Sequence, residues 1–260
     1  MFEYFALTDT GRMRENNEDS VRFDATHGLC VLADGMGGYN AGEVASDMAT
    51  ALITSELGGW LGKAPAQATA REVRRAMEVS VENANASIYE AADANPHYAG
   101  MGTTLVVAVF LHDRLILGHI GDSRCYRWRR GALTQITHDH SLLQEQLDAG
   151  LITPEQAAGS ANRNLVTRAV GIESAITLEV NEYPVEPGDL YLMCSDGLTD
   201  MVGDADIAAV LSGNVALEVL ATRLVERANA CGGRDNISVL LVNASQSTKK
   251  RGIVARLLGK

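Results

Sequence analysis

Short apolar runs of strand length recur along the 260-residue chain. Each run is rich in Val, Ile and Leu and is bounded by Gly, Asp or Asn, which is typical of β-strands. Two of them are separated only by the short polar turn in "FLHDRLIL", which predicts an antiparallel hairpin. The runs predict strands at 29–33, 103–110, 114–120, 189–195 and 236–242.

Three segments between or beside these runs carry apolar residues at the 3.6-residue period of an amphipathic helix. They are "AGEVASDMATALITSEL" at 41–57, the Ala-rich stretch 66–94, and a segment at about 214–230. Grouped hairpins flanked by amphipathic helices favour antiparallel sheet covered by helices over a doubly wound parallel sheet. The pattern therefore predicts an α+β fold.

Two segments depart from this pattern. Residues 135–170 are polar and contain only short helix signals such as "SLLQEQLDAG", where Ser141 and Gln144 fit a capping box. A long insertion of this kind is often a lid or a binding loop. The last residues, "TKKRGIVARLLGK", carry five basic side chains and no acidic one. A frayed tail is the first expectation for them, and a helix that binds a membrane surface or a partner is the alternative.

Composition narrows the class of protein. Apolar residues make up 46% of the chain and charged residues 21%, as in soluble globular proteins. The formal charge of −11 argues against nucleic-acid binding, which needs clustered Lys and Arg, and suits sites for cations. The start "MFEYFALTDTGR" does not resemble a signal peptide, and no run approaches the roughly 20 apolar residues of a membrane span. A cytoplasmic protein with buried free cysteines is expected.

Acidic residues stand at the ends of separate apolar runs. A single Asp-Gly is a common turn, so each of them alone has a structural explanation. If the strands belong to stacked sheets, however, their ends can gather these carboxylates at one edge, where like charges raise each other's pKa and divalent cations relieve the repulsion. Hard oxygen donors favour Mg²⁺ or Mn²⁺. The residues concerned are Asp34, Asp122, Asp196 and Asp235, with Glu18 and Asp19 before "SVRF" and the carbonyl of Gly35 as a further ligand.

Such a group is suited to hydrolysis of a phosphate ester. Two ions roughly 3.5–4 Å apart can ionise a bridging water and clamp a phosphoryl oxygen. Arg14 lies four residues before Glu18 and can offer a bidentate fork to the phosphate. Pairing of Arg14 with Glu15 or Glu18 on the surface is the equally weighted alternative.

Three other groups of residues offer chemistry only at first sight. His138 and His140 in "THDHS" could bind a metal, but a helix start at Ser141 explains the stretch more simply. "CSDG" lacks the Gly-x-Ser-x-Gly frame of a nucleophile elbow around Ser195. Cys125 and Arg130 are too close together in sequence for a thiolate phosphatase loop. The residues therefore favour metal-assisted chemistry over a covalent route.

Seven motifs together resemble the metal-dependent protein phosphatases of the protein phosphatase 2C type, the PPM family, in its compact bacterial form. The resemblance covers residues 3–243 and implies a four-layer α-β-β-α sandwich, with two antiparallel sheets flanked by helices. It also implies one catalytic domain at 1–245, with a flap at about 140–165 and a basic tail at 246–260. The motifs are "GRMRENNEDS", "VLADGMGGYNAGEVAS", "GTTLVVAVF", "HIGDSRCYRWRRGALTQITHDHS", "RNLVTRAVG", "YLMCSDGLTD" and "GGRDNISVLLV".

The resemblance also assigns roles. It implies two Mn²⁺ or Mg²⁺ ions, with Asp34 bridging both and Arg14 binding the substrate phosphate. Asp122, together with Asp196, matches a place where members of the family bind a third ion. The implied ligands are Asp196 and Asp235 for one ion, and Glu18 and the Gly35 carbonyl for the other, supported by Asp19.

Two positions depart from the family pattern. Met36 stands where many eukaryotic relatives have a His that is proposed as the leaving-group acid. Ser160-Ala161 stands where the flap of many bacterial members has His-Pro. The source of the leaving-group proton and the conformation of the flap are therefore not fixed by the resemblance.

The leading hypothesis is a serine/threonine phosphatase that uses a metal-bridging hydroxide and forms no phosphoenzyme. A catalytically idle relative that binds phosphoproteins is the alternative, and a phosphodiesterase acting on nucleotides or nucleic acid is a third hypothesis that the acidity disfavours. The expected partners are phosphorylated proteins, plausibly a serine/threonine kinase and its substrates. The chain is expected to be a monomer.

Overall fold

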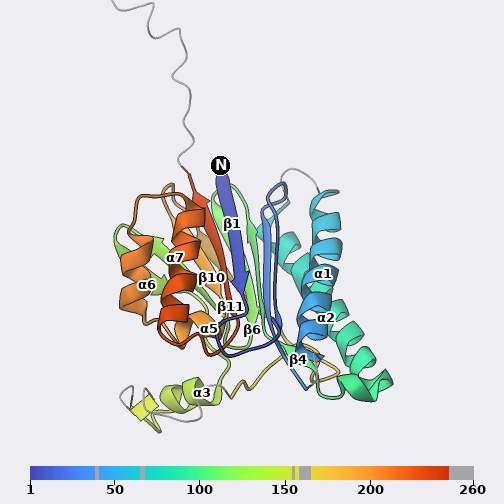
Figure 1. Ribbon diagram of the computed structural model, residues 1–260. Helices are drawn as coiled ribbons and strands as arrows, with labels where there is room; N and C mark the ends of the chain where they lie inside the picture. Colours follow the sequence, from blue (N-terminus) through green and yellow to red (C-terminus); the bar gives the residue numbers. More distant parts are fainter. Residues whose placement is uncertain (39–40, 65–67, 154–155, 158–164, 246–260) are drawn as a thin grey trace, which may run out of the picture.

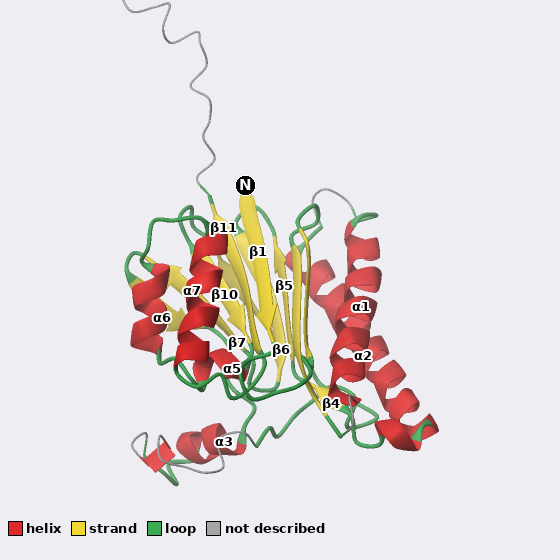
Figure 2. Cartoon of the chain, in the orientation of Figure 1, coloured by secondary structure: helices red, strands yellow, loops and turns green. Residues whose placement is uncertain are grey.

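The computed structural model describes residues 1–38, 41–64, 68–153, 156–157 and 165–245. Two antiparallel sheets pack face to face, and helices cover the outer face of each sheet (Figure 1 and Figure 2). The four-layer α+β sandwich that the resemblance implies is thus confirmed.

The sheets draw their strands from distant parts of the chain. One sheet has the order β1-β11-β10-β7-β8 and the other the order β2-β3-β5-β6-β9, with β4 paired to β3. The expected hairpin is formed by β5 and β6. The first sheet contains β1 (Phe2–Asp9), β11 (Ile237–Ala244), β10 (Leu190–Cys194), β7 (Arg124–Arg129) and β8 (Ala132–Gln135). The second contains β2 (Asp19–Asp24), β3 (Leu29–Met36), β4 (Gly102–Thr103), β5 (Leu105–Phe110), β6 (Arg114–Ile120) and β9 (Glu179–Pro184).

Each sheet has its own helical cover. Helices α1 (Ala41–Leu61) and α2 (Ala70–Ala94) lie against the second sheet, whereas α6 (Asp204–Leu211) and α7 (Leu217–Ala230) lie against the first (Figure 1). The short α5 (Asp196–Thr199) follows β10, and a 3₁₀ turn, η1 (Pro96–Tyr98), follows α2. Helix α3 (Leu142–Asp148) stands away from both covers (Figure 2).

Three apolar layers hold the four structural layers together. The alternation along β3 shows why its sequence is a continuous apolar run: Leu29 and Val31 face α1 and α2, while Cys30 and Leu32 face the other sheet. A strand that is buried on both faces cannot alternate apolar with polar residues. The third layer lies between the first sheet and helices α5 to α7.

The structure corrects several predicted bounds. The run 103–110 is divided into β4 and β5 at Thr104, whose N–H donates to the carbonyl of Asp34 at 2.9 Å. The helix expected from residue 66 begins at Ala70, where Thr69 and Glu72 form a capping box. Strands β1, β7, β8 and β9 were not predicted, because residues of intermediate burial interrupt their apolar pattern.

The structure shows the state of the cysteines and the character of the helices. All four cysteines are free thiols, and three of them are buried as expected, while Cys231 is exposed. Among the helices in the described part of the chain, none is long and apolar enough to cross a lipid bilayer.

Candidate metal centre

The predicted site residues converge on one cavity at the end of the sandwich where β3 and β10 finish and β2 and β11 begin. This cavity has a volume of about 290 Å³. Its lining includes Thr104 and Val166 together with seven of the eight predicted residues, which are Arg14, Glu18, Asp34, Gly35, Asp122, Asp196 and Asp235. The eighth, Asp19, is buried and pairs with Asp34 in the register of β2 and β3.

Antiparallel pairing explains the convergence. Asp19 begins β2 opposite Asp34 near the end of β3, so both carboxylates reach the same edge of the second sheet. In the first sheet, β10 ends just before Asp196, and Asp235 comes just before β11, its antiparallel neighbour. Because the two sheets are stacked, the four carboxylates meet between them.

Crowding in this cavity disfavours ionised carboxylates. Burial and the neighbouring charges of Asp19 and Asp196 raise the pKa of Asp34 well above its ordinary value. Burial, followed by the charge of Asp122, raises the pKa of Asp196 in the same way. Burial is also the main cause that raises the pKa of Asp19 and of Asp122 to about 6. Cations that enter a cluster of this kind stabilise it, because they offset the repulsion between the carboxylates.

The residues fit a divalent cation. Asp19 Oδ2 accepts a hydrogen bond from the Ser195 hydroxyl at 2.8 Å. Asp19 Oδ1 is buried, yet it has no hydrogen-bond partner among the residues that the structure describes. A buried carboxylate oxygen without a partner is costly, and cation binding nearby removes much of that cost. The side chains of the cavity offer carboxylate oxygens, the donors that Mg²⁺ and Mn²⁺ prefer.

Arg14 points into the cavity. Its guanidinium Nη2 lies 2.7 Å from Asp235 Oδ2, and this hydrogen bond is the largest cause that raises the pKa of Arg14. The alternative pairing with Glu15 or Glu18 is not seen among the described ion pairs. The arginine side chain remains half exposed at 50%, so it can also reach a ligand that enters from solvent.

Close packing of backbone holds Gly35 beside Glu18. The Gly35 N–H donates to the carbonyl of Glu18 at 3.0 Å. A Cβ at position 35 would lie 2.1 Å from the carbonyl oxygen of Gly42 in α1 and 2.6 Å from that of Glu18. No real Cβ fits at these distances, so β3 approaches α1 and the Glu18 loop only because residue 35 is glycine.

We expect Gly35→Ala to destabilise the fold by about 1–3 kcal/mol, as overpacking in a close-packed region does. The measurement is the midpoint of urea unfolding in EDTA. Gly38→Ala is the matched control, because a Cβ at position 38 meets nothing within 4 Å. Equal stability of the two variants would contradict the close approach.

Similarity to known proteins shows which family this chain belongs to. Residues 11–241 match the family model described as Protein phosphatase 2C. The chain belongs to this family. It is 36% identical over 247 residues to the serine/threonine phosphatase stp of Listeria innocua, and the match covers 94% of this chain and 96% of that protein.

Two comparisons with proteins named PstP support the same family assignment. The chain is 41% identical to the serine/threonine protein phosphatase PstP of Mycobacterium tuberculosis, of which the match covers 45%. A crystal structure of the PstP catalytic domain in complex with two manganese ions superimposes with a TM-score of 0.81 at 38% identity. That match covers 94% of this chain and 99% of the other.

In this phosphatase family member, three supporting residues were not assigned roles from the sequence. Asn236 Oδ1 accepts the N–H of Glu18 at 2.8 Å, while its side-chain amide donates to the carbonyls of Thr10 and Asn16. Thr104 Oγ1 accepts the N–H of Asp34 at 3.0 Å. The third is Ser195, which bonds Asp19. All three lie within the quoted motifs, directly beside or across from a predicted ligand.

Helix α3 lies at the start of the segment 140–165, which stays a flap only by prediction. Ser141 Oγ accepts the N–H of Gln144 at 3.2 Å and caps α3, which is the N-cap half of the expected capping box. The pair Ser160-Ala161 lies outside the described residues, as does the tail at 246–260. The interpretation of "THDHS" as a helix start is consistent with this cap at Ser141.

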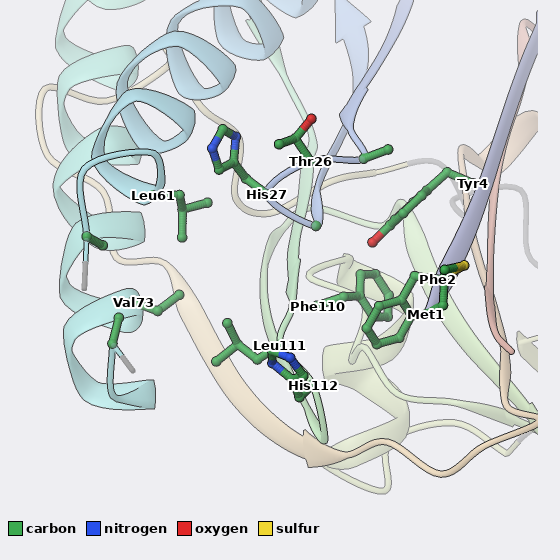
Figure 3. Close-up of a pocket in the computed structure, with 14 residues that line it drawn as sticks. Met1, Phe2, Tyr4, Thr26, His27, Leu61, Val73, Phe110, Leu111 and His112 are labelled. Carbon is green, nitrogen blue, oxygen red and sulfur yellow. The ribbon is translucent and has the colours of Figure 1, made fainter. Parts of the chain in front are cut away.

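A larger cavity lies at the opposite end of the sandwich, near the start of β1. Figure 3 shows its lining around Tyr4, His27 and Phe110, with Leu61 and Val73 contributed by the helical cover. It has a volume of about 440 Å³ but contains none of the predicted carboxylates. Chemistry rather than size therefore identifies the candidate centre.

Proposed function

We propose that this protein is a metal-dependent serine/threonine protein phosphatase that hydrolyses phosphoserine and phosphothreonine without a phosphoenzyme. The observation that carries the proposal is the meeting of Asp34, Asp196, Asp235 and Arg14 in one cavity of a chain in the phosphatase family. A catalytically idle relative would lack some of the metal ligands. This chain has a residue able to act as the ligand at every predicted position.

The carboxylates would hold the cations. Asp34 would bridge two ions, with Asp196 and Asp235 on one and Glu18 and the Gly35 carbonyl on the other. Asp19 would support this shell, and Asp122 with Asp196 would hold a third ion. When bound, such ions neutralise the phosphate and lower the pKa of water at neutral pH. Mn²⁺ is the first candidate because a related catalytic domain was crystallised with it, and Mg²⁺ has the same donor preference.

Arg14 would orient the phosphate. Its guanidinium stands at the cavity and can exchange Asp235 for two phosphoryl oxygens in a bidentate arrangement. Met36 also lines the cavity, and its thioether carries no proton to donate to a leaving group. The position taken by a His in many eukaryotic relatives therefore has no acid role here.

Manganese-dependent release of phosphate from a phosphothreonine peptide tests the function. We expect turnover of the phosphopeptide in Mn²⁺, none in EDTA, and at most weak turnover of a phosphate diester. Activity that survives EDTA would contradict the mechanism. A preference for the diester would favour the phosphodiesterase hypothesis.

Arg14→Ala should lower kcat/KM for the phosphopeptide by about 10- to 100-fold, because a charge-assisted hydrogen bond to phosphate is lost. Steady-state kinetics measure the effect. Arg12→Ala is the control, since that neighbouring residue is exposed and does not line the cavity. If both variants lose activity equally, general electrostatics rather than a specific contact explains the result.

We also propose a location, an oligomeric state, partners and domain bounds for this protein. A cytoplasmic monomer that acts on a serine/threonine kinase and its substrates would fit the family and the acidic composition. We further propose that 1–245 is the catalytic domain and that the tail is dispensable for chemistry. A chain shortened to 1–245 should keep kcat/KM within about twofold of the full chain, since β11 ends at Ala244, at the end of its sheet remote from the carboxylates.

A further inference from the structure

His140 joins two segments that border the candidate metal centre. Its N–H donates to the carbonyl of Gly121 at 2.9 Å, and the N–H of Gly121 donates back to His140 Nδ1 at 3.2 Å. On the other side, the carbonyl of His140 accepts the N–H of Thr167 at 2.9 Å. One buried residue thus connects the turn that carries Asp122 to the chain returning from the predicted flap.

These contacts fix the protonation state of the imidazole. Nδ1 faces an N–H donor, so it must be the acceptor nitrogen, and the proton must be on Nε2. Nε2 lies 3.3 Å from Glu179 Oε2 and can donate to it. Burial of the ring also lowers the pKa of His140. The side chain is therefore neutral and oriented by two different partners.

The same ring belongs to a group that has the residue types of a transition-metal site. His119, His140 and Glu179 place ligand atoms within 4.8 Å of one another. The two imidazoles, however, are stacked at 4.7 Å between centroids and 15° between planes. Parallel rings cannot both direct an in-plane lone pair at one ion. His119 Nε2 is also only 2.7 Å from the carbonyl of His138, so this geometry favours a structural cluster.

The turn at Gly121, which His140 contacts, packs closely against its surroundings. Gly121 has a φ of +97°, and a Cβ there would lie 2.8 Å from Thr104. The hydroxyl of Thr104 in turn accepts the N–H of Asp34. Beyond His140, Ser141 forms a β-bridge with Val166, which lines the metal cavity. A displacement of His140 would thus be transmitted to Asp122 and to the wall of the cavity.

We propose that His140 is a positioning residue that sets Asp122, and with it the third cation site, through the Gly121 N–H to Nδ1 hydrogen bond. The inference rests on the proposed function in its assignment of Asp122 as a ligand. Partners of this kind typically change metal affinity by about 10- to 100-fold when they are removed.

Two substitutions separate the contacts of the ring. His140→Asn keeps an oxygen near the position of Nδ1 and loses the contact with Glu179. His140→Gln keeps a donor near the position of Nε2 and loses the acceptor for Gly121. Calorimetric titration of the metal-free full chain with Mn²⁺ should show the weakest binding event reduced about tenfold in His140→Gln, and within about twofold of wild type in His140→Asn. The tighter events should be unchanged in both.

A double-mutant cycle distinguishes positioning from general damage. Asp122→Ala should remove the weakest binding event, and adding His140→Gln should then have no further effect on Mn²⁺ binding. The proposal is overturned if Asn and Gln act equally, if His140→Gln weakens the remaining events in the Asp122→Ala background, or if Asp122→Ala leaves binding unchanged.

A measurement on the wild-type protein covers the case in which His140→Gln does not fold. The ¹⁵N chemical shifts of His140 should report Nδ1 unprotonated and Nε2 protonated, whereas a proton on Nδ1 overturns the proposal. Binding isotherms and ¹⁵N shifts do not depend on turnover. A wild-type protein that binds Mn²⁺ but does not hydrolyse the phosphopeptide would therefore refute the function and leave this inference standing.

Discussion

Asp34→Asn should lower kcat for the phosphothreonine peptide by at least about 10³-fold at saturating Mn²⁺. Burial raises the pKa of Asp34, and the neighbouring charges of Asp19, Asp196, Asp122 and Asp235 raise it further. We propose that Asp34 contacts more than one of the cations that this cluster holds. The amide keeps the shape of the side chain but removes its charge, so the loss of activity measures the electrostatic role.

The same substitution should stabilise the metal-free protein by about 1–3 kcal/mol, because an amide does not ionise and so avoids the cost that burial and the neighbouring carboxylates impose on Asp34. Urea unfolding in EDTA measures this gain. Asp47→Asn is the control, since that carboxylate is exposed and pairs with Arg22 away from the cavity. A variant that loses activity and also loses stability without metal would indicate a structural role for Asp34 instead.

The metal-free protein should become less stable as the pH rises from about 4 to about 7. Asp19 and Asp122 have pKa values of about 6 in the folded protein, against 3.8 for an ordinary Asp. Between these values the folded state holds more protons than the unfolded state, so the free energy of unfolding falls as the pH increases. A shift of this size corresponds to about 3 kcal/mol for each group at most.

Other titratable groups change the stability in the opposite direction or in a different pH range. Burial alone would raise the pKa of Asp24 and of Asp189, but the hydrogen bonds and charges around each, from His27 and Arg129 among others, outweigh it and lower both values. The stability that these two groups contribute is lost only below about pH 4. His140 opposes the trend below its ordinary pKa of 6.5, because burial keeps it neutral. The effect of this single group is smaller than the combined effect of the four carboxyl groups whose pKa values are raised, Asp19, Asp34, Asp122 and Asp196.

Urea unfolding at pH 5 and pH 7 checks this prediction, once in EDTA and once in Mn²⁺. In EDTA the protein should be more stable at pH 5. In Mn²⁺ the order should reverse, because the ligands must be deprotonated to bind the ion. Greater stability at pH 7 in EDTA would mean that the carboxylates do not repel one another as their positions imply.

Much of this protein could be predicted from local sequence. Strands that are buried on both faces, such as β3, appear as continuous apolar runs, and Asp-Gly pairs at their ends are visible without coordinates. The α+β class follows from hairpins alternating with amphipathic helices. The edge strands β1, β8 and β9 were missed because a strand with an exposed face gives a weaker apolar pattern, as in β8, where exposed residues alternate with residues of intermediate burial.

The supporting contacts could not be predicted in this way. Asn236 bonds Glu18 across 218 positions, and Ser195 bonds Asp19 across 176. A spacing rule in one strand or helix contains no information on which distant side chains meet. For the same reason, local sequence could not predict that Arg14 pairs with Asp235 instead of with Glu15 or Glu18.

The sequence by itself determined the strands with two buried faces, the helical stripes and the identity of the acidic and basic residues, because these depend on side-chain type and local period. Only the tertiary structure decided that the carboxylates share a cavity, that Arg14 faces it, and that His140 holds the turn beside Asp122. The reason is physical: the energy of a charge cluster depends on distances across stacked sheets, and those distances are set by the pairing of strands far apart in the chain.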